Sequence, residues 1–189
     1  MAQEKWERIN GVVCPWWLIG MFDNPLRRII QNPERVLSGQ VKPGQVAADI
    51  GCGMGYFTVP LARLVGPEGR VLAIDLQEKM LAGVRRRAAR AGVGGRVQSC
   101  QASPAGLGVA GPVDFVLTFW MVHEIPDQER FLEEIHALLR PGGTWLLAEP
   151  PIHVTKVSFD RTVALAQKLG FTPLSRPHIG FSRAVLFSR

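Results

Sequence analysis

Apolar runs and amphipathic stretches alternate along most of the chain, with short polar connections between them. Five runs have the length and composition of strands, and they lie at residues 46–50, 70–75, 96–101, 113–119 and 144–149. Stretches with apolar residues at helical spacing lie between them, at residues 56–65, at residues 78–91 and after Asp127. The chain then closes with one more helix and two further strands, at residues 171–175 and 181–187.

Capping residues mark where several helices begin. The Asn-Pro pairs at residues 24–25 and 32–33 each place proline directly after an asparagine cap, which predicts helix over about residues 25–38, in one or two pieces. Asp127 is expected to cap the helix that precedes the fifth strand, and Ser158 to cap the last helix.

The regular alternation of strand and helix predicts an α/β fold: a doubly wound, mostly parallel sheet with helices on both faces. The two closing strands bring the sheet to seven strands and supply an antiparallel last strand. We expect residues 41–189 to form one compact domain, with residues 1–40 as a leader and cap helices over the active site. Ligands of such sheets bind beyond the carboxyl ends of the strands, so the candidate loops follow residues 50, 75, 101, 119 and 149.

Composition restricts the classes of protein to which the chain can belong. With 189 residues, 47% of them hydrophobic and 20% charged, it is long enough for a domain core and too apolar for a disordered protein. Its three cysteines have no C-x-x-C spacing, which argues against a disulfide framework or a zinc site and fits a reducing cytoplasm. The longest apolar run, residues 11–22, is broken by Pro15 and is too short to span a bilayer, so we expect no stable membrane insertion.

The net charge of +6 is concentrated in the first half of the chain. Residues 1–96 carry 14 basic and 8 acidic side chains, so that 14 − 8 = +6. A basic half is compatible with binding to nucleic acid or to an anionic membrane surface, but at this magnitude we interpret it as a solvated surface. The apolar stretch at residues 12–22 is expected to lie over the pocket as a lid. Packing in the core and contact with a membrane are the alternatives for this stretch.

Three glycines alternate with other residues directly after the first strand, at Gly51, Gly53 and Gly55. Because glycine has no Cβ, it lets the backbone turn sharply and approach a ligand closely. A dinucleotide-binding fingerprint requires glycine or alanine where Tyr56 stands, and a P-loop requires a Gly-Lys pair that this segment does not contain. The sequence therefore disfavours a phosphate ligand.

Two carboxylates flank this loop, Asp49 at the end of the first strand and Asp75 at the end of the second. A carboxylate that points into the cleft from Asp49 suits a cationic ligand group. Asp75 is placed to accept hydrogen bonds from both hydroxyls of a ribose, by the geometry that serves nicotinamide-binding folds. A cation together with a ribose, bound by a loop that is not adapted to phosphate, describes S-adenosylmethionine.

At these residues the sequence resembles the class I S-adenosylmethionine-dependent methyltransferases. The Asp-x-Gly-x-Gly-x-Gly pattern at residues 49–55 is similar to the first motif of that family, and Asp75 with the residue after it is similar to the second. The Leu-Leu-Arg-Pro-Gly-Gly at residues 138–143 is similar to the run into the fifth strand in small-molecule members of the ubiquinone-biosynthesis and type-11 kind. The resemblance covers residues 41–188 and implies a Rossmann-like fold, S-adenosylmethionine as the cofactor and methyl transfer as the activity.

The resemblance also implies which residues hold the cofactor. The acid of the second motif holds the ribose and the next residue, here Leu76, packs on the adenine. In the third motif, Gln101-Ala102 stands where the family usually has Asp-Ala, and a glutamine amide can also pair with the adenine amino group. The implied cofactor residues are Asp49, Gly51, Gly53, Gly55, Asp75, Leu76, Gln101, Ala102 and Thr118.

Two histidines follow neighbouring strands at this edge, His123 after the fourth and His153 after the fifth. Because histidine titrates near neutral pH, we expect one of them to orient or deprotonate the methyl acceptor. The alternative is that both are loop histidines bonded to the backbone. Together with Glu124 and Glu149 they also have suitable ligand types for a metal. No H-E-x-x-H motif exists, however, because Asp127 stands at the second histidine position, and we expect no metal.

These observations lead us to expect a methyltransferase that acts on a small, apolar or aromatic acceptor by in-line displacement. An RNA methyltransferase that uses the basic first half is one alternative, although we find no appended nucleic-acid domain. A protein that binds S-adenosylmethionine without catalysing transfer is another, and a nicotinamide oxidoreductase fits the loop less well. The expected partner is a small-molecule acceptor rather than nucleic acid.

Overall fold

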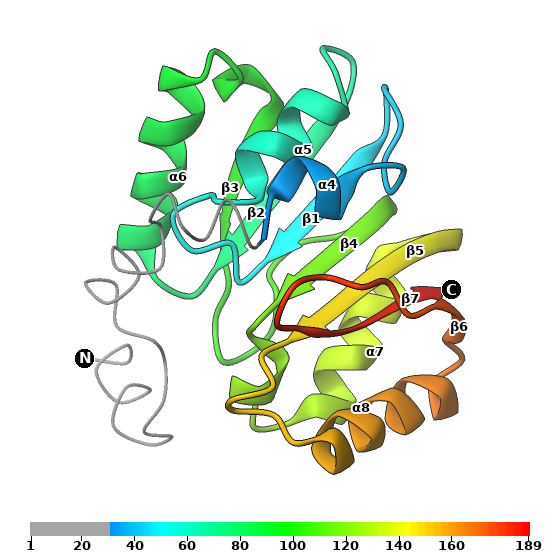
Figure 1. The fold of residues 1–189 in the computed structure, drawn as a ribbon. Helices are drawn as coiled ribbons and strands as arrows, with labels where there is room; N and C mark the ends of the chain where they lie inside the picture. The colour runs from blue at the N-terminus through cyan, green and yellow to red at the C-terminus, as the bar shows by residue number, and fades with distance from the viewer. Residues whose placement is uncertain (1–30) are drawn as a thin grey trace.

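The computed structural model describes residues 31–189, in which one seven-stranded sheet is covered by helices on both faces (Figure 1). The strands are β1 (Val46–Ile50), β2 (Arg70–Asp75), β3 (Val97–Gln101), β4 (Val113–Phe119), β5 (Leu139–Glu149), β6 (Thr172–Ser175) and β7 (Arg183–Ser188). Their order across the sheet is β3-β2-β1-β4-β5-β7-β6. Strands β1 to β5 pair in parallel, β7 runs antiparallel to β5, and β6 runs antiparallel to β7. The predicted sheet of seven strands, mostly parallel, is therefore confirmed.

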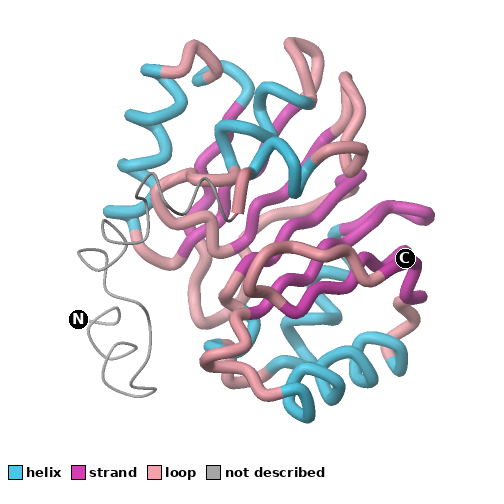
Figure 2. Tube along the Cα trace, viewed as in Figure 1, coloured by secondary structure: helices cyan, strands magenta, loops and turns pink. Residues whose placement is uncertain are grey.

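Two groups of helices cover the two faces of the sheet, and Figure 2 shows them in cyan on either side of the magenta strands. The helices are α4 (Pro33–Leu37), α5 (Thr58–Leu64), α6 (Glu78–Arg90), α7 (Gln128–Leu138) and α8 (Lys156–Lys168), with short 3-10 turns η1 (Gly94–Arg96) and η2 (Val122–Glu124). Helices α4, α5 and α6 lie on one face, and α7 and α8 lie on the other (Figure 1).

Alternate residues of each central strand point to opposite faces, so each strand contributes to both cores. On β4, Phe115 and Leu117 pack in the cluster beneath α4 and α5, whereas Val116 packs in the cluster beneath α7 and α8. All three side chains are fully buried, as expected for a parallel sheet that is covered on both faces.

Trp145 of β5 lies in the hydrophobic cluster beneath α7 and α8. Its ring centroid is 5.0 Å from that of Phe171 and 5.0 Å from that of Phe187. Its indole N–H donates a hydrogen bond to Oγ1 of Thr118, at 2.9 Å. An unpaired buried donor costs about 1–3 kcal/mol, so this bond stabilises the aromatic cluster and orients Thr118 toward the core.

Two of the predicted helix caps are confirmed. Oδ1 of Asn32 accepts a hydrogen bond from the backbone N–H of Arg35 at 3.2 Å, at the start of α4. Oδ1 of Asp127 accepts one from the N–H of Arg130 at 3.1 Å, at the start of α7. The predicted lid and the first part of the predicted helix fall within residues 1–30, which lie outside the described residues.

The fifth strand begins earlier than predicted, at Leu139 rather than at Thr144. Leu139 pairs with Val113, and after an irregularity in the register Thr144 pairs with Phe115. The Pro-Gly-Gly at residues 141–143 therefore does not precede the strand but is accommodated within it, where the irregular pairing takes up the extra residues.

The predicted cap of the last helix is wrong. Helix α8 is capped by Thr155, whose Oγ1 accepts a hydrogen bond from the backbone N–H of Ser158 at 3.1 Å. Ser158 lies inside the first turn and supplies the donor rather than the cap. The helix begins three residues earlier than the serine suggested because Thr155 already satisfies a free N–H of the first turn.

Replacement of Thr155 by alanine is expected to lower the free energy of unfolding by about 1 kcal/mol, because the first turn of α8 loses its side-chain acceptor. The matched change Ser158→Ala is expected to leave it within about 0.5 kcal/mol of the wild type. Urea unfolding monitored by circular dichroism measures both. A larger loss for Ser158→Ala than for Thr155→Ala would show that the cap is assigned to the wrong residue.

Candidate functional site

The glycine loop connects β1 to α5 at the carboxyl edge of the sheet. Gly51, Gly53 and Gly55 have φ angles of 71°, 53° and 84°, in the left-handed region that other residues rarely adopt. The backbone N–H groups of Gly51 and Cys52 both donate to the carbonyl oxygen of Ile74, at 2.9 and 3.1 Å. The loop is thereby held against the end of β2.

Gly51 also allows a close contact with the segment that follows β4. A Cβ at Gly51 would lie 2.8 Å from Cγ of Met121, which is closer than ordinary packing allows. The contact joins the loop after β1 to the loop after β4, whose strands are neighbours in the sheet. The two loops therefore form one continuous surface at the point where the strand order reverses.

The carboxyl group of Asp49 is buried beside this loop, with the residue only 3% exposed. Its Oδ2 accepts a hydrogen bond from Oγ1 of Thr58 at 2.5 Å. Burial raises the pKa of Asp49 to about 7, while the bond from Thr58 lowers it and the charge of Asp75 raises it further. The group is thus near its titration midpoint at neutral pH, and a cation beside it would favour the carboxylate.

Asp75 joins the glycine loop to the turn before α6. Its Oδ2 accepts from the N–H of Gly53 at 3.0 Å, and its Oδ1 accepts from the N–H of Gln77 at 2.9 Å. Burial raises the pKa of Asp75 to about 6, although the backbone N–H donors of Gln77, Gly53 and Leu76 lower it. Each carboxylate oxygen has a further lone pair, so both oxygens can still accept hydroxyl donors.

Three more of the predicted cofactor residues, Leu76, Gln101 and Ala102, lie beside Asp75. The side-chain amide of Gln101 donates to the carbonyl oxygen of Leu76 at 3.1 Å. The backbone N–H of Ala102 donates to the carbonyl oxygen of Asp75 at 3.0 Å. The structure therefore brings the ends of β2 and β3 together, as the sequence predicted.

Thr118 does not belong to this group. Its side chain has no exposed surface, and its hydroxyl accepts the indole N–H of Trp145 in the core. The strand presents this side chain to the helix-covered face, and the predicted contact of Thr118 with a cofactor stays a prediction.

The chemistry of this edge fits a cationic ligand with hydroxyl groups and does not fit a phosphate. Residues 49–58 include no lysine or arginine. The N–H groups of Gly51, Cys52 and Gly53 already donate within the protein, whereas phosphate-binding loops direct such groups at the ligand. The acidic pair, Asp49 and Asp75, therefore sets the charge of the site.

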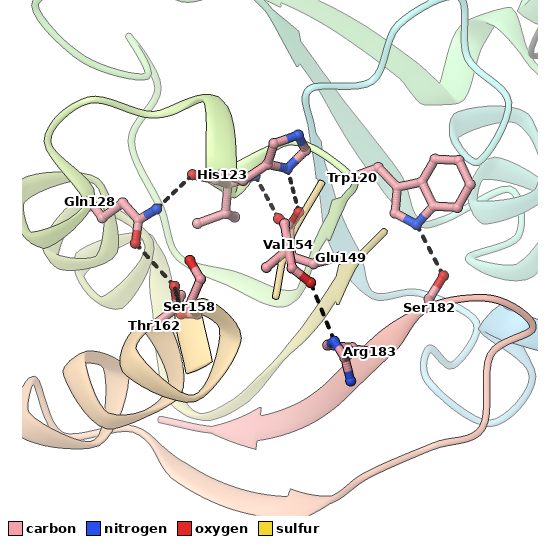
Figure 3. Close-up of polar contacts among 10 residues, drawn as sticks. Trp120, His123, Gln128, Glu149, Val154, Ser158, Thr162, Ser182 and Arg183 are labelled. Carbon is pink, nitrogen blue, oxygen red and sulfur yellow. Dashed lines mark hydrogen bonds and ion pairs between the residues drawn. The ribbon is translucent and has the colours of Figure 1, made fainter. Parts of the chain in front are cut away.

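A second group of polar side chains lies at the ends of β4 and β5 (Figure 3). Glu149 is 2% exposed. Its Oε1 accepts the backbone N–H of Val122 at 2.8 Å, and its Oε2 lies 2.5 Å from Nδ1 of His123. The ring of His153 faces that of His123, with centroids 6.0 Å apart and planes 9° from parallel. The structure thus brings the two predicted histidines together.

The environment of His123 favours its protonated form. Burial lowers the pKa of the imidazole, but the hydrogen bond to Glu149 and the charges of Glu149 and Glu124 outweigh it, so the pKa lies above its usual value. A histidine of this kind takes up a proton readily near neutral pH.

Trp120 lies between the two groups in a strained backbone conformation, with a φ of 61°. Its N–H donates to the carbonyl oxygen of Ala148 at 2.8 Å, and its indole N–H donates to Oγ of Ser182 at 3.0 Å (Figure 3). Its ring centroid is 5.6 Å from that of Phe119. Strain held in place by several contacts is common where side chains are presented to ligands.

The sequence did not indicate the roles of two residues of the site, Thr58 and Glu149. Thr58, the hydrogen-bond partner of Asp49, belongs to no motif that would mark it. From the sequence, Glu149 was considered only as a metal ligand. Its place at the end of the apolar run 146–148 indicates a buried charge, and a buried charge needs a hydrogen-bond or ion-pair partner.

The described part of the chain offers no group of three or more His, Cys, Asp or Glu side chains able to hold a metal ion. Within residues 31–189 there is also no helix with the length and hydropathy needed to cross a membrane.

Comparison with known proteins gives a consistent family. A model described as a methyltransferase domain matches residues 47–143. The ubiquinone/menaquinone biosynthesis C-methyltransferase UbiE of Klebsiella pneumoniae is 32% identical over 110 residues, which are 58% of this chain and 44% of that protein. The protein of the same name from Teredinibacter turnerae is 34% identical over 154 residues, or 78% of this chain and 61% of that one. The chain spans about half the length of the curated relatives it matches.

Among solved structures, a SAM-dependent methyltransferase from Aquifex aeolicus superposes with a TM-score of 0.84 at 23% sequence identity. The match covers 93% of this chain and 99% of that one. At this identity the likeness establishes a shared fold.

The raised pKa values of Asp49 and Asp75 predict an unusual pH dependence of stability. Asp49 and Asp75 lose their protons near the usual value of 3.8 when unfolded, but near 7 and 6 when folded. Between these values the unfolded chain binds fewer protons, so their contribution to stability is lost as the pH rises from about 4 to 7. We expect Asp49→Asn to gain stability relative to the wild type by a few kcal/mol between pH 5 and pH 8. Urea unfolding at pH 5 and pH 8 measures the difference in the free energy of unfolding between the variant and the wild type. The same difference at both pH values would contradict a raised pKa of Asp49 in the folded state.

Proposed function

The chain belongs to the methyltransferase domain family, and on that basis we propose that it transfers a methyl group from S-adenosylmethionine to a small apolar or aromatic acceptor. The observation that carries the proposal is the pair of acids, Asp49 buried and Asp75 partly buried, on either side of a glycine loop. In that loop the N–H groups of Gly51, Cys52 and Gly53 already donate inside the protein. This arrangement suits a positively charged nucleoside without a phosphate.

The proposed cofactor contacts follow from the geometry of that edge. Asp49 provides negative charge for the cationic part of the ligand, and Asp75 accepts hydrogen bonds from the ribose hydroxyls. Leu76 and the Gln101-Ala102 pair lie at the adjoining strand ends, where an adenine would pack. S-adenosylmethionine supplies a methyl group on a positively charged sulfur, which is an activated carbon.

The proposed acceptor site lies beyond the ends of β4 and β5, next to the glycine loop. Met121 contacts the position of Gly51, and Trp120 precedes it in the chain with its indole ring fixed by Ser182. These side chains offer apolar and aromatic contacts, while His123 and His153 offer polar ones. An aromatic acceptor also agrees with the names of the relatives, which are C-methyltransferases of quinone biosynthesis.

The protein's main task in this reaction is to hold donor and acceptor in line, which can contribute roughly 7–11 kcal/mol to lowering the barrier. Exclusion of water from the reacting groups helps further. We propose this covering role for residues 1–40. Gln31, the first described residue, is held in place by the Tyr56 hydroxyl, which donates to the Gln31 carbonyl oxygen at 3.0 Å.

Calorimetric titration with S-adenosylmethionine and with S-adenosylhomocysteine tests the proposal. The wild type is expected to bind both nucleosides. Asp75→Asn and Asp49→Asn are each expected to weaken the binding of S-adenosylmethionine by about 10- to 100-fold, because each removes a charged hydrogen-bonding or electrostatic partner. Asp127→Asn is the matched control, since asparagine caps a helix as well as aspartate does.

Absence of binding to both nucleosides, or binding that is unchanged in the Asp49 and Asp75 variants, would contradict the proposed cofactor site. Transfer of labelled methyl groups to small-molecule extracts then separates an enzyme from a protein that only binds the nucleoside. Transfer to RNA instead, with strong dependence on salt, would indicate the nucleic-acid alternative.

A further inference from the structure

Glu149 is a buried carboxylate at the end of an otherwise apolar strand. The three residues before it, 146–148, have no exposed surface. Within residues 31–189, it forms no ion pair with lysine or arginine, and its contacts are the backbone N–H of Val122 and the imidazole of His123. A charge in such a place is costly unless it is satisfied. In the neutral ring the Nδ1–H of His123 donates to Glu149, and after His123 takes up a proton the imidazolium pairs with the same carboxylate.

These contacts fix which nitrogen of His123 is available. Nδ1 faces Oε2 of Glu149, and a carboxylate accepts but does not donate, so Nδ1 carries a hydrogen. In the neutral ring, the lone pair is then on Nε2. This nitrogen has no hydrogen-bond partner in the described part of the chain, and the side chain of His123 is 21% exposed. The arrangement is that of a base whose orientation and tautomer are set by a carboxylate behind it.

The groups that surround His123 favour uptake of a proton by its ring. Glu149 on β5 and Glu124 on η2 supply negative charge, and His153 stacks on the ring from the loop after β5. Arg183 on β7 is turned to the carbonyl oxygen of Val154, to which its Nε donates at 3.3 Å (Figure 3).

His123 is also close to the proposed methyl donor. It follows Met121 by two residues, and Met121 packs on Gly51 of the glycine loop. His123 therefore lies on the segment that borders the proposed donor site.

We propose that Glu149 is a positioning residue that holds His123 as the proton acceptor, and that the methyl acceptor is a hydroxylated aromatic ring. The inference rests on the proposed function. A base is needed only where the nucleophile carries a proton at working pH, as a phenol does with a pKa near ~10. An amine or a thiol that is already deprotonated would make the dyad unnecessary.

The step balances without any further reactant. The hydroxyl proton of the acceptor moves to Nε2 of His123. The electron pair released, on oxygen or on a ring carbon conjugated with it, forms the new bond to the methyl carbon. The electron pair of the broken carbon–sulfur bond stays on sulfur. For transfer to oxygen, the proton taken up by His123 leaves to solvent. For transfer to carbon, the methylated ring carbon loses its proton to solvent and the proton on His123 returns to the oxygen, which restores the phenol.

Imidazole two-bond proton–nitrogen NMR on the full chain tests the dyad without any acceptor. The wild type is expected to show His123 as the Nδ1–H tautomer with a pKa above that of an ordinary histidine. Glu149→Gln presents an amide N–H to Nδ1 and is expected to lower the pKa of His123 and to move the hydrogen to Nε2. Glu133→Gln, at an exposed carboxyl of α7, is the matched control and leaves both unchanged.

The wild-type spectrum alone keeps the proposal falsifiable if Glu149→Gln does not fold. A neutral wild-type His123 with its hydrogen on Nε2, or with a pKa at or below the ordinary value, would overturn the dyad.

The acceptor class is tested with labelled S-adenosylmethionine and a small-molecule extract as the probe. The wild-type rate is expected to rise through the pKa of His123 as the pH increases. In Glu149→Gln the rise of the rate with pH is expected to occur at lower pH, and the maximal rate is expected to fall at least tenfold. A labelled product that retains a hydroxylated or methoxylated ring supports the inference. A product methylated on nitrogen or sulfur overturns it while leaving the proposed function intact, whereas absence of binding to the nucleoside overturns the proposed function itself.

Discussion

Three carboxyl groups lie at one edge of the sheet, those of Asp49 and Glu149 buried and that of Asp75 partly buried, and the surrounding structure is arranged to satisfy them. A charge removed from water is stable only where donors replace the water. The Thr58 hydroxyl does this for Asp49, backbone N–H groups do it for Asp75, and His123 does it for Glu149. Each acid thus organises the loop or helix that supplies its donors.

This requirement explains why the glycine loop makes so many hydrogen bonds within the protein. Its N–H groups are held by the end of β2 and by Asp75 rather than left free. The loop therefore presents carbonyl and carboxylate oxygens rather than donors, so the same backbone turn that binds phosphate in other folds here favours a cation. The contact between Gly51 and Met121 then brings the acceptor side within reach of the donor side.

The fold and the cofactor side of the site could be predicted because their signals are local. Strand β1 ends where its apolar run ends, and Asp75 closes the second strand as its spacing indicated. The direction of the Thr118 side chain could not be predicted, because a strand buried on both faces has no polar alternation from which to determine it. The last helix is capped by Thr155 rather than by the predicted Ser158, because both residue types cap helices well and only the path of the chain after β5 decides between them.

The sequence by itself determined the order of strands and helices, the glycine turn and the acids beside it, since each depends on residues that are neighbours in the chain. The pairing of His123 with Glu149 joins residues 26 positions apart, and no local pattern requires it. It follows from the register of β4 against β5, in which Phe119 lies opposite Ala148. That register places the residue after Ala148 beside the turn after Phe119. Only the packing of the whole sheet on its helices fixes the register, because a slip along either strand would expose its apolar side chains.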